Sequence, residues 1–380
     1  MTRTVCVVSV SRADRAMAAV VGRALDEAGV STLAMVVDDP LGPDSLIEDH
    51  GVRTRRIPAH MNGDGPAELG RRMGALTAAF AEVLADERPD IIVLTGDRYE
   101  TLAAAGAASL AGVVIAHLHG GELTLGAMDD AFRHAITKLA HLHFPATDAA
   151  AARLIRMGEE DWRITIAGAP GLDVLMSASP MPRADFFRAL NMDDPGDFIL
   201  ATWHPETLSP DGGAAGLEAL LAALTQAARP VLFTGVNADP GGAGQAAHIR
   251  NWAEGNASVH LIPSLGALYA PALAHAAVMA GNSSSGIIEA AAFALPVVNV
   301  GDRQKGRDRG ANVIDAAADP AAVRQALTRA LDPAFRAGLT GMANPYGDGR
   351  AGPRIAARLA AEPIGDRLRQ KSFPGEERPS

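Results

Sequence analysis

Carboxylates, an arginine and a histidine are concentrated in one short stretch of this sequence. Glu122, Asp129, Asp130, Arg133 and His134 all fall within the fifteen residues 120–134. Asp130 and His134 stand four residues apart, as do Asp129 and Arg133, so each pair would share one face of a helix. A helix start enriched in aspartate would explain this pattern. The other interpretation is acid–base chemistry, in which neighbouring carboxylates allow one of them to hold a proton near neutral pH.

A second candidate site is the serine loop, Gly281-Asn282-Ser283-Ser284-Ser285-Gly286, which joins an apolar run to a helical pattern. Backbone N–H groups at a helix start are unsatisfied and lie at the positive end of the helix dipole, so hydroxyls and glycines beside them can bind a phosphate. Glu289 follows one turn later, where a carboxylate would repel phosphate but could accept hydrogen bonds from ribose hydroxyls. A simple capped turn would explain the serines equally well.

The elements that must position these residues alternate along the chain. Short β-branched runs alternate with alanine-rich helical patterns, which is typical of parallel sheets built from βαβ units. A cluster of glycine and proline over residues 168–182 suits a domain connection. We therefore predict an α/β fold with two Rossmann-like domains, residues 1–175 and 176–354. The expected strands are 5–10, 32–37, 91–95 and 113–117 in the first domain, and 198–202, 231–234, 259–262, 277–280 and 296–300 in the second.

Polar residues gather where these predicted strands end. In open parallel sheets, ligands bind at the carboxyl ends of the strands. If the two sheets face each other, all the polar clusters should line one cleft. Besides the serine loop, these clusters are Ser9 to Arg12, Gly96 to Arg98, His117 to Glu122, Trp203 to Glu206 and Asn237 to Asp239.

Composition excludes several classes of protein. The 380 residues are 48% apolar, with a formal net charge of −10, which argues against a nucleic-acid partner. The single Cys6 allows no intrachain disulfide, and the apolar run around it is too short for a signal peptide or a membrane span. We expect a cytoplasmic protein with no membrane partner. His117, His119, His141 and His143 alternate as strand residues do, so we expect no metal site, and residues 371–380 read as a disordered tail.

The motifs, taken in order, resemble those of the UDP-N-acetylglucosamine 2-epimerase family over nearly the whole chain. The resemblance is nearer to the hydrolysing branch, which opens the biosynthesis of sialic acid and related nonulosonic acids. It implies two facing domains in the GT-B arrangement, a C-terminal helix over residues 355–370 that returns to the first domain, a homodimer or homotetramer, and no cofactor. The matching motifs are Ser11-Arg12-Ala13-Asp14, Gly96-Asp97-Arg98, His119-Gly120-Gly121-Glu122, Asp129-Asp130 to Lys138, the serine loop, and Gly301 to Arg307.

The resemblance also implies a reaction. A base removes the proton at sugar carbon 2, the nucleoside diphosphate leaves carbon 1, and water then adds to the 2-acetamidoglycal while a proton returns to carbon 2 from the opposite face. Acids and bases for these steps are needed on both faces of the ring. The candidates are Asp97, Glu122, Asp129 and Asp130, with His119, Arg133 and His204 near the reacting centre. For the nucleotide, UDP ahead of GDP, they are Arg12, Arg98, Arg303, Ser283 and Ser284 at the diphosphate, Glu289 at the ribose, and Asn237 and Asp239 beside it.

Two departures leave the sugar open. Arg15-Ala16 stands where the family usually has tyrosine and then glycine or serine, and His119 replaces a glutamate found in part of the family. The substrate could therefore carry N-acetylglucosamine or a 2,4-diacetamido-2,4,6-trideoxy sugar. The alternatives are a non-hydrolysing epimerase, which would release no free nucleotide, a GT-B glycosyltransferase, which would require an acceptor, and a catalytically silent nucleotide-sugar sensor, which would lack the carboxylates.

Overall fold

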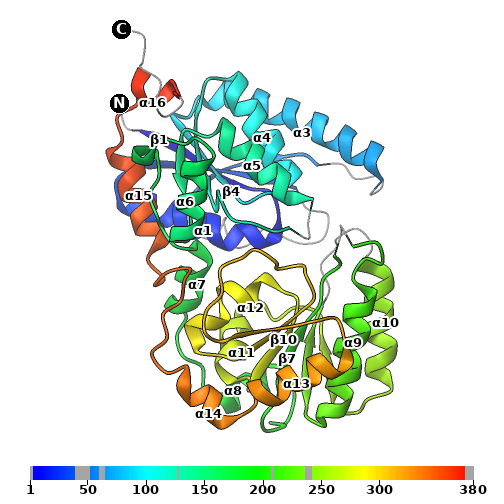
Figure 1. Ribbon diagram of the computed structural model, residues 1–380. Coiled ribbons are helices and arrows are strands. Elements are labelled where there is room, and N and C mark those ends of the chain that lie inside the picture. Colours follow the sequence, from blue (N-terminus) through cyan, green and yellow to red (C-terminus); the bar gives the residue numbers. More distant parts are fainter. Residues whose placement is uncertain are drawn as a thin grey trace. The chain divides into compact units, whose positions relative to one another are not determined.

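Two compact units make up the chain (Figure 1). The computed structural model describes residues 3–38, 52–59, 65–125, 128–206, 209–235 and 242–372, except for the side chains of Arg12, Ala13 and Ala243. Unit 1 comprises Met1–Glu122, Asp129–Val174 and Tyr346–Ser380, and unit 2 comprises Leu123–Met128 and Leu175–Pro345. The main division falls between Val174 and Leu175, next to the expected boundary after residue 175.

Unit 1 is built on a six-stranded parallel sheet in the order β3-β2-β1-β4-β5-β6. The central strands are buried along nearly their whole length, which is why they read as continuous runs of valine, isoleucine and leucine. The strands are β1 (Thr4–Ser9), β2 (Ser31–Val37), β3 (Arg53–Ile57), β4 (Ile91–Thr95), β5 (Val114–Leu118) and β6 (Leu142–Phe144).

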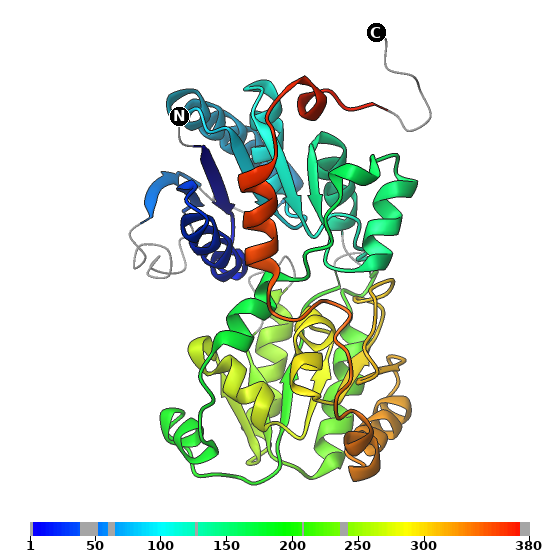
Figure 2. The ribbon, with the colours of Figure 1, turned by 90° about the vertical axis from the view of Figure 1, so that its left-hand side faces the viewer.

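Helices cover both faces of this sheet (Figure 1). One core lies under α3 (Pro66–Glu87), α4 (Tyr99–Leu110) and α5 (Asp129–Leu139). The other lies under α1 (Arg12–Glu27) and α15 (Ala351–Ala361), which pack side by side (Figures 1 and 2). The C-terminal segment thus returns to unit 1 as α15 and the short α16 (Asp366–Arg369), and α6 (Asp148–Arg156), η1 (Asp161–Arg163) and α7 (Pro170–Ser177) complete the unit.

Unit 2 repeats this architecture with a parallel sheet in the order β12-β11-β10-β7-β8-β9. The strands are β7 (Ile199–Thr202), β8 (Val231–Thr234), β9 (Val259–Ile262), β10 (Val278–Gly281), β11 (Val297–Val300) and β12 (Val313–Ala316). The helices are α8 (Arg183–Ala189), α9 (Ala214–Ala227), α10 (Gly242–Glu254), η2 (Gly266–Leu268), α11 (Tyr269–His275), α12 (Ser284–Ile288), η3 (Ala290–Phe293), α13 (Pro320–Ala330) and α14 (Pro333–Gly338).

The predicted fold class, two Rossmann-like α/β domains, is confirmed. Three strands at sheet edges, β3, β6 and β12, fall outside the predicted set. The edge strand β3 has the sequence Arg-Thr-Arg-Arg-Ile and is largely solvated, so no apolar run marks it. None of the helices among the described residues combines the length and apolarity that a bilayer span requires.

The first residues of the expected disordered tail are anchored to unit 1. Lys371 Nζ lies 2.6 Å from the buried Glu159 Oε2 and donates to the carbonyl oxygen of Lys138 at 3.1 Å, at the end of α5. Ser372 Oγ donates to Glu160 Oε1 at 3.1 Å. The prediction of disorder is therefore wrong for these two residues, whose side chains have ionic and hydrogen-bonding partners, while residues 373–380 lie outside the described part of the chain.

Candidate active site

The loop after β4 places Asp97 at the carboxyl end of this central strand of the unit 1 sheet. Gly96 has a φ of +77°, a left-handed conformation that favours glycine, and its N–H donates to the carbonyl oxygen of Leu118 at 3.1 Å. This turn directs Asp97 toward α5, where its carboxylate pairs with Arg133. Arg98 begins the next helix and donates from Nε to the buried Glu100 at 3.1 Å. The loop therefore presents one carboxylate and one guanidinium side by side.

The loop after β5 holds a histidine and a carboxylate in direct contact. His119 Nδ1 lies 2.6 Å from Glu122 Oε1, and both side chains are largely buried. His119 itself has a φ of +62°, which is uncommon for a residue with a side chain. Gly121 has a φ of +79°, and a Cβ there would lie 2.4 Å from the carbonyl oxygen of Ala150. A tight backbone arrangement thus holds the His119–Glu122 pair in place.

Arg133 on α5 is the centre at which these segments meet. Its side chain is 1% exposed and pairs with Asp97, with Asp130 Oδ1 at 3.1 Å and with the carbonyl oxygen of Glu122 at 3.0 Å. Burial lowers the pKa of this guanidinium, but the charges of Asp97, Glu122 and Asp130 outweigh that effect and raise it. The structure therefore brings together Asp97, Glu122, Asp130 and Arg133, which come from three segments.

Two further predicted residues lie at the edge of this cluster. His134 Nε2 lies 3.3 Å from Asp130 Oδ2, which is the expected pairing of residues four apart. Asp129 lies near Arg98: burial lowers the pKa of Arg98, while the charges of Glu100, Asp14 and Asp129 raise it. Arg98 and Asp129, at the starts of α4 and α5, thus contribute opposite charges beside the four central groups.

Asp14 is a carboxyl group whose role in this region the spacing of motifs did not reveal. It is 9% exposed and accepts a hydrogen bond from Ser11 Oγ at 2.8 Å. Burial raises its pKa from 3.8 to about 6, an effect that Ser11 and Arg98 partly offset and Asp97 reinforces. The Arg12 side chain lies outside the described part of the chain, and Arg15 is buried in α1. Burial distinguishes Asp14 from an ordinary surface carboxylate. Burial at this position depends on the tertiary structure, so local sequence does not reveal it.

In unit 2 the buried amide of Asn282 ties three loops together. Its Oδ1 accepts from the backbone N–H of His204 at 2.8 Å, and its Nδ2 donates to the His204 carbonyl oxygen at 2.8 Å. The Asn282 carbonyl oxygen accepts from Arg303 at 3.2 Å and from the side chain of Gln304 at 2.9 Å. The loops after β7, β10 and β11 are thus fixed to one another by neutral amides and one guanidinium.

The serine loop begins α12 as predicted. Ser283 is the N-cap residue, and its Oγ accepts from the N–H of Ser285 at 3.3 Å. Because α12 has only five residues, an anion here would depend on N–H groups and hydroxyls more than on a helix dipole. Burial raises the pKa of Glu289, which Ser285 partly offsets, and Tyr269 Oη contacts Ser285 Oγ. Asn237 and Asp239 lie outside the described residues.

The side chain of His204 in unit 2 is a neutral imidazole at neutral pH. Its side chain is largely buried, and burial, reinforced by the charge of Arg303, lowers its pKa to about 3. Its Nδ1 is a buried polar atom without a hydrogen-bond partner. A ring in this state can donate or accept a hydrogen bond but carries no positive charge of its own, whereas Arg303 places a cation near it.

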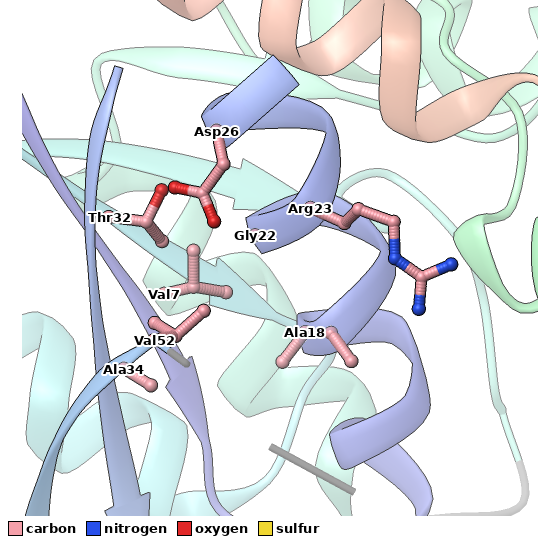
Figure 3. A pocket seen from close by; sticks show the side chains of 9 residues that line it. Val7, Ala18, Gly22, Arg23, Asp26, Thr32, Ala34 and Val52 are labelled. Atoms are coloured by element: carbon pink, nitrogen blue, oxygen red, sulfur yellow. The ribbon is translucent and has the colours of Figure 1, made fainter. Parts of the chain in front are cut away.

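Two cavities lie in the described part of the chain. One, of about 560 Å³, lies between the loops after β7, β11 and β12, and its lining includes Glu206, Gly301 and Arg309 but neither Ser283 nor Glu289. The other, of about 130 Å³, lies in unit 1 between α1 and the first strands, and Figure 3 shows its mostly apolar walls, with Val7, Ala18 and Val52. Neither is lined by the carboxylates around Arg133.

The chemistry of the two halves differs. Unit 1 presents several carboxylates, a histidine and two guanidinium groups, which suits proton transfer beside a developing negative charge. Unit 2 presents serine hydroxyls, backbone N–H groups and Arg303, which suits binding of an anion. Sequence reasoning did not identify Asn282, Gln304 or Asp14 as residues that organise these halves.

Known proteins resemble this chain over most of its length. The family model described as UDP-N-acetylglucosamine 2-epimerase matches residues 43–360. The chain is 37% identical over 265 residues to a GDP/UDP-N,N'-diacetylbacillosamine 2-epimerase (hydrolyzing) of Campylobacter jejuni, covering 69% of each chain. It is 36% identical over 317 residues to the UDP-N,N'-diacetylbacillosamine 2-epimerase (hydrolyzing) of Legionella pneumophila, covering 83% of this chain and 82% of the relative.

Solved structures share the fold at lower sequence identity. The UDP-GlcNAc 2-epimerase of Neisseria meningitidis, solved bound to UDP-GlcNAc, has a TM-score of 0.83 at 17% identity and covers 94% of this chain and 100% of that one. The UDP-GlcNAc 2-epimerase of Methanocaldococcus jannaschii, in complex with UDP-GlcNAc and UDP, has a TM-score of 0.78 at 17% identity, with the same coverage. On the matched family model and these relatives, the chain belongs to the UDP-N-acetylglucosamine 2-epimerase family.

Proposed function

We propose that the chain is a hydrolysing nucleotide-sugar 2-epimerase, which converts a nucleotide-linked 2-acetamido sugar and water into the free manno sugar and a nucleoside diphosphate. The observation that carries this proposal is the gathering of Asp97, Asp130 and Glu122 around the buried Arg133. Inversion at carbon 2 with loss of the carbon 1 substituent requires several proton-handling groups at one site, and unit 1 supplies them.

The reaction has two stages. In the first, a carboxylate takes the proton from carbon 2, the electrons of that C–H bond form the C1=C2 double bond, and the C1–O bond breaks with its electrons on the diphosphate. In the second, a water molecule gives its hydroxyl to carbon 1, and a proton is delivered to carbon 2 on the face opposite to the first removal. The remaining proton of that water restores the acid that protonated carbon 2, and the proton taken in the first stage leaves to the solvent or with the nucleoside diphosphate, so one water is consumed per nucleoside diphosphate released.

Within unit 1 the ion pairs suggest how the roles divide. Asp97 and Asp130 both pair with Arg133, which holds their carboxylates in place as candidate proton acceptors. Glu122 shares a short contact of 2.6 Å with His119, and a proton held between these two groups can be delivered to the sugar. Asp129 and Arg98 complete the set, with Arg98 placed to counter negative charge on the leaving group.

Unit 2 would bind the nucleotide. Ser283, Ser284 and Arg303 are the proposed ligands of the diphosphate, and the neutral His204 would donate a hydrogen bond to it. Glu289 would accept from the ribose hydroxyls, because its carboxylate lies beyond the phosphate-binding turn and next to Tyr269 and Ser285. Arg12, Asn237 and Asp239 belong to the same proposal.

The proposed sugar is a 2,4-diacetamido-2,4,6-trideoxy sugar carried on UDP or GDP. Support comes from the Campylobacter and Legionella relatives, whose names specify N,N'-diacetylbacillosamine and hydrolysis. UDP-N-acetylglucosamine is the second candidate, favoured by the family description and by the 28% identity to a polysialic acid biosynthesis protein of Escherichia coli. Either substrate places the product in nonulosonic acid biosynthesis.

Phosphorus NMR on the purified protein tests this proposal. The protein is incubated separately with UDP-N-acetylglucosamine, UDP-diacetylbacillosamine and GDP-diacetylbacillosamine, with the Asp97→Asn variant as control for contaminating activity. Free nucleoside diphosphate should appear with at least one of them, together with a free manno sugar. Interconversion of two nucleotide sugars without release would identify a non-hydrolysing epimerase, release only with an added acceptor would identify a transferase, and unchanged substrate would indicate a binding protein.

The proposal extends to assembly and location. The family resemblance implies a homodimer or homotetramer that works in the cytoplasm. Light scattering coupled to gel filtration measures the oligomeric state. A monomer at micromolar concentration that still turns over substrate would remove oligomerisation from the proposal.

A further inference from the structure

His117 is a buried histidine that lies below the carboxylate cluster and faces three of the segments that form it. It lies in β5, two residues before His119, and its side chain is fully buried. Its Nε2 is 2.8 Å from the Gly96 carbonyl oxygen, and its Nδ1 is 3.2 Å from Thr137 Oγ1. Gly96 directly precedes Asp97, and Thr137 lies one helical turn after Arg133 on α5.

The hydrogen bonds fix the tautomer of this ring. A carbonyl oxygen only accepts, so Nε2 must carry the proton and donate to Gly96. The Nδ1 atom then accepts from the Thr137 hydroxyl. Burial lowers the pKa of His117 to about 3, with smaller effects from the Gly96 hydrogen bond, His143, Arg133 and Asp97. The ring is thus neutral and has both nitrogens engaged, so it has no free position from which to take a proton.

The third segment at His117 is the loop that carries Glu122. A Cβ on Gly120 would lie 3.0 Å from His117 Nδ1 and 3.2 Å from Thr137 Oγ1. A side chain at residue 120 would therefore crowd the ring and the Thr137 hydroxyl, so glycine suits the close approach of this loop. One imidazole consequently touches the Gly96–Asp97 turn, the Gly120–Glu122 loop and the helix that carries Asp130 and Arg133.

We propose that His117 is a positioning residue, which holds the Gly96–Asp97 peptide so that the Asp97 carboxylate meets Arg133 in the geometry required for proton transfer. The inference rests on the proposed function for the role of Asp97. The Gly96 peptide is held on both sides, by its own N–H to Leu118 and by its carbonyl oxygen to His117. Without the second bond, only the N–H bond to Leu118 holds this left-handed turn, so the Gly96–Asp97 peptide can shift and carry Asp97 with it.

The proposal makes a distinction between chemistry and binding. A misplaced base lowers the rate of the chemical step, whereas the nucleotide ligands proposed in unit 2 are unaffected. A displacement of about 1 Å in a reacting group can cost on the order of 100-fold in rate. The expected signature is therefore a fall in kcat with little change in the dissociation constant for the nucleoside diphosphate.

Four variants separate this role from a structural one. His117→Leu removes both hydrogen bonds at nearly the same volume, and His117→Gln restores an N–H donor at the position of Nε2. His143→Leu is the matched control, because His143 pairs with His117 in the neighbouring strand β6, is equally buried and contacts Glu159 at 2.9 Å instead of the catalytic loop. Thr137→Val, which removes only the hydroxyl, serves as a milder variant if a leucine variant does not fold.

The measurements are kcat for nucleotide release, the dissociation constant for UDP and the melting temperature. We expect His117→Leu to lower kcat by roughly 10- to 100-fold and Thr137→Val by roughly 3- to 10-fold, with UDP affinity within about twofold of wild type. His117→Gln should recover to within about threefold of wild type. A kcat for His117→Leu that matches the His143→Leu control, a glutamine variant as slow as leucine, or a Thr137→Val variant with unchanged kcat would overturn the inference. If Asp97→Asn kept full activity, the proposed role of Asp97 would fail, whereas a wild-type protein that releases no free nucleoside diphosphate would contradict the proposed function itself.

Discussion

The two halves of the candidate site use different kinds of polar groups. In unit 1 the polar groups are charged, with Asp97, Asp130 and Arg133 forming ion pairs below the surface. In unit 2 the loops are joined mainly by the neutral amides of Asn282 and Gln304, and the histidine there is uncharged. Groups that exchange protons have to titrate, while groups that hold a phosphate only have to donate hydrogen bonds. Unit 1 therefore has groups suited to proton transfer, and unit 2 has groups suited to anion binding.

The largest effect should come from removing a unit 1 carboxylate. We expect Asp97→Asn to lower kcat by about two to four orders of magnitude, because the amide cannot accept the carbon 2 proton. UDP affinity should stay close to wild type, since Asp97 is not among the proposed nucleotide ligands. Steady-state kinetics and calorimetry measure both, with the exposed Asp86→Asn on α3 as control. An Asp97→Asn variant that loses UDP binding as strongly as turnover would contradict the assignment of proton transfer to unit 1 and nucleotide binding to unit 2.

A smaller effect is expected on the pH dependence of stability in unit 1. Burial raises the pKa of Asp14 from 3.8 to about 6, so its contribution to stability is present below pH 3.8 and is lost as the pH rises through 6. Asp14→Asn removes this loss. We expect the variant to gain up to about 3 kcal/mol relative to wild type between pH 4 and pH 7, measured by urea unfolding. A difference that stays constant over this range would mean that Asp14 ionises normally.

In unit 2, replacing His204 should change the pH dependence of stability in the opposite direction. The pKa of His204 falls from 6.5 to about 3 on folding, so stability is full above pH 6.5 and declines as the pH falls toward 3. His204→Gln should therefore gain on wild type as the pH is lowered from 7 to 4, by up to about 3 kcal/mol. The same unfolding series measures it. Parallel pH trends for the two variants would contradict the proposed contrast in charge.

The smallest effect concerns the serine loop. Ser283→Ala removes one hydroxyl that caps α12, worth about 0.5–1.5 kcal/mol, so we expect KM to rise roughly 2- to 10-fold with kcat nearly unchanged. Ser109→Ala, at an exposed position near the end of α4, is the matched control. A fall in kcat at constant KM would show that Ser283 acts in the chemical step and not in nucleotide binding.

What the sequence predicts well is local. The serine loop, the strands that end in polar residues and the Asp130–His134 pair all depend on spacings of a few residues, and each of these features is present. The Asp97–Arg133 pair joins residues 36 apart, and the contact of Asn282 with His204 joins residues 78 apart. Such pairs depend on which strands become neighbours, so local spacing does not reveal them. The edge strand β3 escaped prediction because solvation removes the apolar signal.

Burial is the second quantity that spacing does not supply. His117 and Asp14 both belong to motifs seen in the sequence, yet their roles depend on the loss of solvent around them. The same loss makes His204 neutral, although a histidine at a proposed phosphate site would ordinarily be expected to carry charge. Arg12, Asn237 and Asp239 remain predictions, since the structure does not describe the groups that would act there.

Proton exchange at carbon 2 tests the central claim most directly. The protein is incubated with a UDP-linked 2-acetamido sugar that it consumes, in heavy water, and the free sugar is examined by proton NMR and mass spectrometry. The account predicts one deuterium at carbon 2 of the manno product in every turnover, together with one UDP released. A product that retains its original proton at carbon 2, or a free sugar still in the gluco configuration, would contradict the account.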